Sequence, residues 1–306
     1  GRYARAEKSS AAALELKESP VISTISALIA ARSAHELGKY TRRDEFIAMA
    51  ESNAPKEITA RLMTQAELLL DEHRPEEALK ILRSVHTAET RQHAAALRLE
   101  LKAQQQSKNW DAVLGLLPQL EQFDATDIMR MKQLRRDAHV ENLKSRTLNP
   151  QALKEYWQNI SSTDKKDNKV AAVAARAYSL MGDCATARQI IEESLDSQWD
   201  SELAELYAQC LGDDAIRQIE RAETWLRAHP NDASLLLALG RLCVQRELWG
   251  KAQNYLEASL SVEPGYPAHL ALAKLNEKLD RPELAKDHYG KGLELALRRL
   301  DAQEQA

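Results

Sequence analysis

The few residues whose spacing could support catalysis lie in patterns that predict helices or polar turns. Residues Ser162–Lys165 have the spacing of a serine nucleophile and its lysine, but the polar residues around them predict a turn between two helices. Gly290–Gly292 is the one Gly-x-Gly of the chain, and it lies inside a helical pattern rather than after a strand, where a phosphate-binding loop would begin. The sequence therefore predicts a protein that is not an enzyme.

Histidine and cysteine, which commonly bind metals, form no recognisable motif. The eight histidines are scattered and include no His-Glu-x-x-His zinc site. The three cysteines, Cys184, Cys210 and Cys243, are far apart and odd in number. This usage is typical of free, buried thiols in a reducing compartment. We expect no metal, no cofactor and no disulfide.

Composition indicates which elements must carry any function. The 306 residues include 42 Lys+Arg and 46 Asp+Glu, for a formal net charge of −4 without a basic block, which argues against a nucleic-acid partner. No run of 18 apolar residues is present, so the sequence predicts no membrane span. Strong helix formers dominate, and only 10 Gly and 9 Pro occur. The composition predicts an all-α protein.

The sequence repeats with a period of about 34 residues. Leu239–Leu242 is matched one period later by Leu272–Leu275, and an alanine follows each at the same distance, Ala252 in the first copy and Ala285 in the second. These alanines mark the second helix of a two-helix unit, and Pro75, Pro150 and Pro282 are expected near the start of such helices. Because one helical hairpin cannot bury its apolar face alone, the units must stack. The alanines assigned to this position are Ala78, Ala112, Ala152, Ala187, Ala222, Ala252 and Ala285.

Leu239, Gly240, Ala252 and Pro264 stand at the spacing of the tetratricopeptide repeat (TPR), which the chain resembles. The resemblance implies a superhelical solenoid of stacked helical hairpins, an interaction fold. We expect a single TPR solenoid over residues 1–306, with about eight repeats after a leading half-repeat. The repeat boundaries are indistinct in residues 113–160 and 196–230. The best-matched repeats are residues 59–92, 168–200, 233–265 and 266–298.

In the TPR pattern the first helices line the concave surface, so they supply the candidate binding residues. One hypothesis is a groove that becomes basic toward the C-terminal half and suits an acidic peptide or a carboxylate-bearing ligand. The alternative is that these charged residues only solvate the surface. The partner-binding candidates are Glu67, Glu141, Arg176, Arg241 and Lys274. The remaining positions of the same row are Ser33, Leu101 and Leu211.

Two longer segments, residues 1–45 and 229–260, resemble the HemY proteins of proteobacteria. The most specific piece is Leu248–Ala252, which reads Leu-Trp-Gly-Lys-Ala. The resemblance covers nearly the whole chain. It implies an inner-membrane protein linked to a late step of protohaem synthesis. Family members carry an N-terminal membrane hairpin before the repeats, and we expect this chain, which begins within a repeat at Gly1, to be a fragment without it.

The resemblance implies a non-catalytic scaffold at the inner membrane. Its partners would be haem-pathway enzymes such as ferrochelatase or protoporphyrinogen oxidase. The family's usual topology, together with the three thiols, favours the cytoplasmic face. The family name is shared with an unrelated flavin-dependent oxidase, but that enzyme needs a Gly-rich βαβ unit, which this sequence lacks. The alternative function is a haem or porphyrin carrier, with His35 or His269 as the candidate haem ligand.

Overall fold

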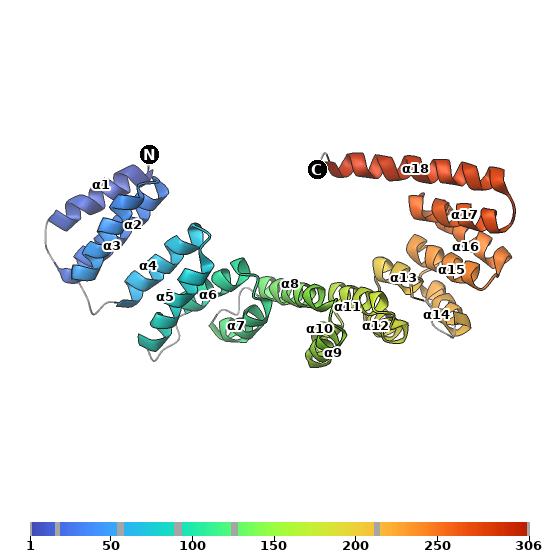
Figure 1. The fold of residues 1–306 in the computed structure, drawn as a ribbon, viewed down its shortest axis with the longest axis horizontal. Helices are drawn as coiled ribbons and strands as arrows, with labels where there is room; N and C mark the ends of the chain where they lie inside the picture. The colour runs from blue at the N-terminus through green and yellow to red at the C-terminus, as the bar shows by residue number, and fades with distance from the viewer. Residues whose placement is uncertain are drawn as a thin grey trace. The chain divides into compact units, whose positions relative to one another are not determined.

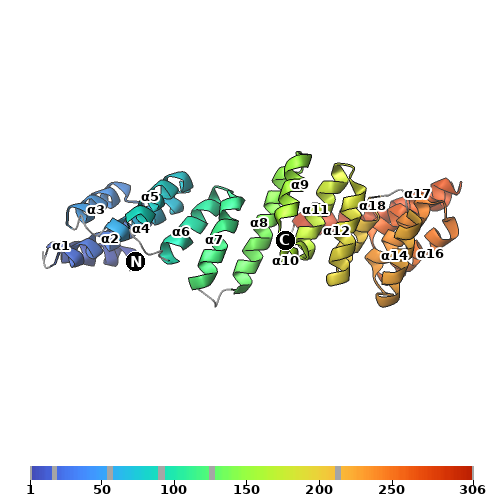
Figure 2. The ribbon, with the colours of Figure 1, turned by 90° about the horizontal axis from the view of Figure 1, so that it is seen from below.

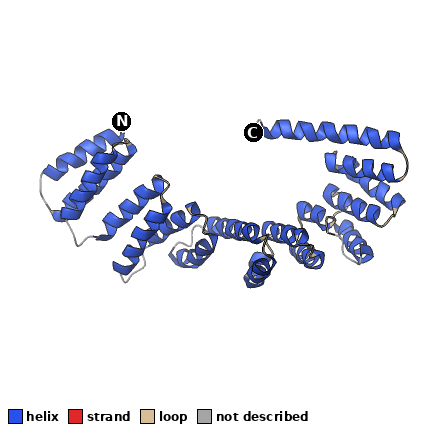
Figure 3. Cartoon of the chain, viewed as in Figure 1, coloured by secondary structure: helices blue, strands red, loops and turns tan. Residues whose placement is uncertain are grey.

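The fold is known from a computed structural model that describes residues 2–15, 19–53, 58–88, 94–123, 128–210 and 215–304. Every regular element in these ranges is a helix, as Figure 3 shows. The predicted all-α class of stacked TPR-type hairpins is confirmed. The chain divides into two compact units, residues Gly1–Ala138 and His139–Ala306, and each is described by itself.

In the N-terminal unit, successive helices pack side by side (Figure 1). Helix α1 packs on α2, α2 on α3, and α4 on α5, while α6 packs on both α5 and α7. The last helix, α8, continues across the boundary between the units. The helices are α1 (Arg2–Glu15), α2 (Pro20–Glu36), α3 (Tyr40–Asn53), α4 (Ile58–Asp71), α5 (Pro75–Ala88), α6 (Ala94–Gln106), α7 (Trp110–Phe123) and α8 (Ile128–Arg146).

The C-terminal unit repeats the same hairpin, and its successive helices are drawn in Figure 2. Pairs α11–α12, α15–α16 and α17–α18 each form a hairpin, and α13 and α14 each pack on α15. The helices are α9 (Pro150–Asn159), α10 (Ser162–Lys165), α11 (Asn168–Leu180), α12 (Cys184–Ser197), α13 (Ser201–Tyr207), α14 (Ala215–Ala228), α15 (Ala233–Gln245), α16 (Trp249–Val262), α17 (Tyr266–Lys278) and α18 (Pro282–Glu304). Prolines begin α5, α9 and α18, as predicted.

The turn inside each of six hairpins has the same backbone geometry. A residue with positive φ stands two positions before the second helix, and the next amide donates to the carbonyl five residues back, as Asp183 does to Tyr178 at 3.0 Å. This is the Schellman way of ending a helix. Because four of the six residues are not glycine, the sequence pattern hides the turn. They are Gly38, His73, Lys108, Gly182, Glu247 and Asp280.

The alanine assignment is correct in four hairpins and wrong in three. Ala78, Ala187, Ala252 and Ala285 are buried at the fourth residue of their second helices. The fourth residues of α7, α9 and α14 are also buried, but they are Val113, Leu153 and Gln218 rather than Ala112, Ala152 and Ala222. The position demands burial and not an alanine, so an alanine close to it, such as the fully buried Ala222 of α14, misplaces the register.

The packing around Gly240 explains why a glycine follows Leu239 in this repeat. A Cβ atom at this position of α15 would lie 2.4 Å from Cδ2 of Leu256 on α16. Leu256 is fully buried, and buried side chains are close-packed, so moving it would disturb its neighbours. The glycine therefore sets how closely the two helices of this hairpin approach.

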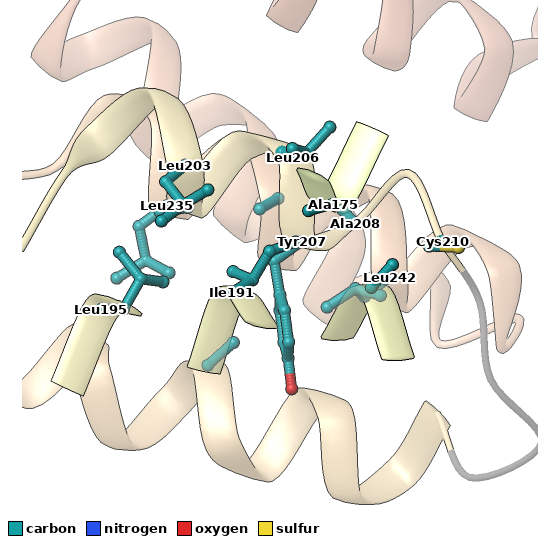
Figure 4. Packing of buried hydrophobic residues seen from close by; sticks show 14 of the residues in the cluster. Ala175, Ile191, Leu195, Leu203, Leu206, Tyr207, Ala208, Cys210, Leu235 and Leu242 are labelled. Atoms are coloured by element: carbon teal, nitrogen blue, oxygen red, sulfur yellow. The ribbon is translucent and has the colours of Figure 1, made fainter. Parts of the chain in front are cut away.

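The repeat at residues 196–230 has a short first helix, α13, of seven residues. The buried Gln218 side chain donates to the carbonyls of Tyr207 (2.6 Å) and Cys210 (3.2 Å) at the end of this helix. Tyr207 itself lies in the core cluster with Ile191 and Leu242 (Figure 4). The side chain of Gln218 thus replaces backbone hydrogen bonds that a longer helix would make.

The prediction of three free thiols is wrong for two of them. Cys184, at the start of α12, and Cys210, after α13, form a disulfide across 26 residues of sequence. Cys243 is free and buried, as predicted, and burial raises the pKa of its thiol to about 11. Sequence spacing could not reveal the pair because hairpin packing, and not proximity in sequence, brings the two cysteines together.

Candidate functional site

A cavity of about 930 Å³ opens in the N-terminal unit against α2, α4, α6 and the first turns of α8. These are first helices of successive hairpins, the helices expected to line a groove. The apolar side chains of the lining include Met63, Leu99, Met131 and Leu134. The basic ones are Arg32, Arg98, Lys102 and Arg130, and the acidic ones are Glu67 and Asp137. The formal charge of this lining is therefore +2.

Some of the charge is offset locally. Arg32 forms an ion pair with Glu67 across neighbouring hairpins. The ammonium of Lys102 lies 2.9 Å from a carboxylate oxygen of Asp71. Both pairs are partly exposed, so each contributes little to stability and water or a ligand can compete for them. The site therefore has an apolar floor and a polar rim that can rearrange.

An exposed apolar strip on α2 leads to this cavity. Ile22, Ile25 and Ile29 are 46%, 50% and 48% exposed, at the i, i+3, i+7 spacing of one helix face. The next exposed residue along the face is Arg32, which lines the cavity. On its other faces α2 is largely buried by its neighbours. Side chains of this kind on the one open face of a helix are typical of a protein-interaction surface. We call Ile22, Ile25 and Ile29 the α2 strip.

The predicted groove residues are distributed over both units. Glu67 lines the cavity together with Leu101, while Ser33 is buried on α2. Glu141, on α8, forms an ion pair with Lys144 at 2.7 Å. Leu211 lies outside the described residues.

The three basic candidates lie on three first helices of the C-terminal unit. Arg241 on α15 pairs with Glu205 on α13 at 2.8 Å, so its charge is offset within the array. Arg176 on α11 and Lys274 on α17 are exposed. Arg176 and Lys274 thus remain the basic positions that a partner could reach.

His35 lies in a polar cluster. Its ring is 3.3 Å from an Arg43 guanidinium nitrogen, 3.9 Å from Glu72 and edge-to-face with Tyr40. Burial favours a raised pKa for Glu72, but hydrogen bonds from Arg43 and Arg74 outweigh burial and lower it. Anionic Glu72 and cationic Arg43 therefore surround this histidine.

His269 pairs with His288, and their Nδ1 atoms are 2.9 Å apart. Burial lowers the pKa of His269, and His288 and Lys291 lower it further. Neither His35 nor His269 is among the described residues that line the cavity. Within the ranges that the structure describes, no group of three or more His, Cys, Asp or Glu residues is placed to hold a metal ion.

From the sequence, one position in the first helix of each repeat was expected to line the groove. Two residues at that position, Glu67 and Leu101, line the cavity, and the other lining residues were not predicted. Arg98, Lys102 and Gln105 lie on the same face of α6 at helical spacing. The sequence alone predicts that these residues share a helix face. It does not predict that the face lines a cavity, because the cavity is completed by the turns of α8 that carry Arg130 and Leu134.

The relatives of the chain agree with its resemblance to a known family. It is 26% identical over 305 residues to Protein HemY of Escherichia coli K12, covering 97% of this chain and 74% of that protein. Protein HemY of Shigella flexneri matches equally well. No protein-family model matches the chain.

Solved structures resemble it with low scores. MamA AMB-1 has a TM-score of 0.37 and 21% identity, over 53% of this chain and 96% of MamA. The anaphase-promoting-complex hetero-tetramer Cut9–Hcn1 has a TM-score of 0.40 and 16% identity, over 96% of this chain and 63% of that one. The relationship thus rests on the sequence matches: the expected resemblance to the HemY proteins is confirmed across 97% of the chain.

Proposed function

We propose that the chain is the interaction domain of a non-catalytic scaffold that recruits enzymes of late haem synthesis at the bacterial inner membrane. Homology to HemY proteins supports the pathway. Stacked hairpins support a binding role, since such arrays present extended surfaces to partners. Bringing successive enzymes together raises their effective concentration at the step where a poorly soluble tetrapyrrole changes hands. Ferrochelatase and protoporphyrinogen oxidase are the proposed partners.

One observation carries this proposal: the α2 strip continues into a cavity with an apolar floor and a polar rim in which basic side chains outnumber acidic ones. A partner segment with apolar residues on one side and carboxylates beside them would bury its apolar face there and place its carboxylates near the basic side chains of the lining, where they would compete with the present partners of those side chains. Apolar contacts would supply most of the affinity, and the charges would set orientation and association rate.

The test is capture of detergent-solubilised ferrochelatase and protoporphyrinogen oxidase by the purified chain. The double variant Ile25→Glu/Ile29→Glu places charges on the α2 strip without opening the core, because both side chains are half exposed. We expect at least a tenfold loss of affinity. Ile216→Glu is the matched control, since Ile216 is 63% exposed on α14 of the other unit. Equal capture by the α2-strip variant and the control would refute the site.

The exposed basic residues Arg176 and Lys274 are proposed as a second contact for acidic partner segments. Arg176→Glu/Lys274→Glu should weaken capture at low salt and have little effect at high salt, because exposed charges are screened. An unchanged affinity at low salt would show that these residues only solvate the surface and do not contact the partner. A single continuous array over residues 1–306 is part of the same proposal.

A second candidate function is direct binding of a haem or porphyrin. The specific observation is that two thioethers, Met63 and Met131, line the same cavity as four basic side chains. An apolar macrocycle with two carboxylates suits that lining, and thioethers are known haem ligands. Titration with hemin tests it: a Soret shift that Met63→Ala weakens supports a carrier, and an unshifted spectrum rejects it.

Attachment to the inner membrane is also proposed from the family resemblance. No helix in the described part of the chain is long and apolar enough to cross a bilayer. The cytoplasmic face, which the family topology implies, no longer gains support from three free thiols, because Cys184 and Cys210 are bonded. Disulfides persist mainly in oxidising compartments. Thiol alkylation in intact cells distinguishes the two faces of the membrane. Labelled Cys184 and Cys210 would indicate the cytoplasm, and an intact disulfide would indicate the periplasm.

A further inference from the structure

The C-terminal helix carries an apolar strip that nothing in the described chain covers. Leu293, Leu297 and Leu300 are 60%, 52% and 57% exposed and follow one face of α18 at the i, i+4, i+7 spacing. Helix α18 has 23 residues, whereas α17, on which it packs, has 13. Every residue from 297 to 302 is exposed. The last turns of α18 therefore extend beyond the hairpin while presenting leucines. We call Leu293, Leu297 and Leu300 the α18 strip.

The charges beside the α18 strip are acidic. At 100° per residue, Glu294 and Asp301 follow the leucines directly around the helix, on the same side of the strip. Arg298, which pairs with Glu294 at 2.6 Å, lies further round. On the other side of the strip stands the uncharged residue Ala296. A surface that receives this strip should therefore be apolar with basic side chains at its edge.

The N-terminal unit has such a surface. The first and last residues of the α2 strip, like those of the α18 strip, are seven positions apart, which is about 10.5 Å of helix. The cavity beside the α2 strip has a volume of about 930 Å³, and its lining carries a formal charge of +2, or +1 when Asp71, the partner of Lys102, is included. A helix about 10 Å across fills that volume with roughly two turns, the length of α18 from residue 297 to its end. Length, polarity and charge all match.

We propose that the α18 strip of one copy of this chain docks on the α2 strip and the adjoining cavity of a second copy. The two surfaces differ, so the contact is heterologous: the copy that donates α18 keeps a free α2 strip, and the copy that receives it keeps a free α18 strip, which allows further copies to add. The proposal rests on the cavity of the proposed function, so self-association and partner binding compete for one surface. Partners then bind more tightly to dilute chain than to associated chain.

Sedimentation velocity of the purified chain over a hundredfold concentration range tests this contact. Wild type should shift from monomer to larger species as concentration rises. Leu297→Glu/Leu300→Glu alters only exposed side chains and should stay monomeric, as should Ile25→Glu/Ile29→Glu. The control Ile216→Glu should associate like wild type. Circular dichroism verifies that each variant is folded.

Mixing the two monomeric variants gives the decisive result. The α2-strip variant retains a normal α18, and the α18-strip variant retains a normal cavity, so an equimolar mixture should form a 1:1 dimer and nothing larger. A wild type that is monomeric throughout, or a mixture that stays monomeric, overturns the proposal. The proposed function is judged separately: the α18-strip variant should still capture the haem enzymes, and its failure to do so would count against that function alone.

Discussion

Gly240→Ala is expected to destabilise the C-terminal unit, although alanine is the better helix former. The added methyl would lie 2.4 Å from Cδ2 and 2.5 Å from Cγ of the buried Leu256. Overpacking of this kind costs about 1–3 kcal/mol, and the gain in helix propensity returns about 1 kcal/mol. We therefore expect a net loss of up to about 2 kcal/mol in the free energy of unfolding.

A second background separates the contact from any general effect of the substitution. In Leu256→Ala the obstructing atoms are gone, so Gly240→Ala should become stabilising by up to about 1 kcal/mol. The sign of the effect thus reverses, a coupling typical of residues in contact. Gly250→Ala is the control in the same hairpin, because a Cβ there meets nothing within 4 Å. It should leave stability unchanged or slightly raised.

The assay is urea unfolding followed by tryptophan fluorescence. Trp157, Trp199, Trp225 and Trp249 all lie in the C-terminal unit, so the signal reports mainly that unit. The midpoint changes at constant slope give the free energies. Equal destabilisation by Gly240→Ala in both backgrounds would refute the reasoning, since it would show that Leu256 is not the group that the methyl meets.

Three further perturbations test other parts of the fold. Reducing the Cys184–Cys210 disulfide, which closes 26 residues, should cost the C-terminal unit about 3.5 kcal/mol by loop-closure entropy; an unchanged urea midpoint in dithiothreitol would contradict this. Gln218→Ala should cost about 2 kcal/mol because two buried carbonyls lose their donor, and urea unfolding measures it. Because the pKa of Glu72 is lowered from its usual 4.5, its contribution is present above pH 4.5 and disappears as the pH falls through the lowered value. Glu72→Gln should accordingly lose less thermal stability than wild type on acidification. Melting temperatures of the two proteins that fall in parallel with pH would contradict this.

The general architecture could be predicted because helix composition and a period of about 34 residues are properties of the sequence alone. Pro75, Pro150 and Pro282 begin helices as expected, since a proline costs nothing at a first helical position. The register in the irregular repeats could not be predicted. Val113, Leu153 and Gln218 occupy the buried position there, and a search for small residues overlooks them.

The candidate site was harder to predict because it depends on contacts between repeats. A single row of positions found Glu67 and Leu101 but not the α2 strip, whose isoleucines resemble core residues until the packing shows them exposed. The Cys184–Cys210 bond likewise arises from the packing of α12 against the irregular repeat. Sequence periodicity identifies which residues share a helix face, and only tertiary packing decides which of those faces stays open.

Hydrogen–deuterium exchange of the chain, alone and with a saturating haem-pathway enzyme, tests the central claim most directly. If partners bind there, the enzyme should slow exchange in α2, α4, α6 and the start of α8, the helices of the α2 strip and the cavity. Changes should be much smaller in α14, which carries the control residue Ile216. A bound enzyme that leaves exchange in α2, α4 and α6 unchanged would show that partners bind elsewhere.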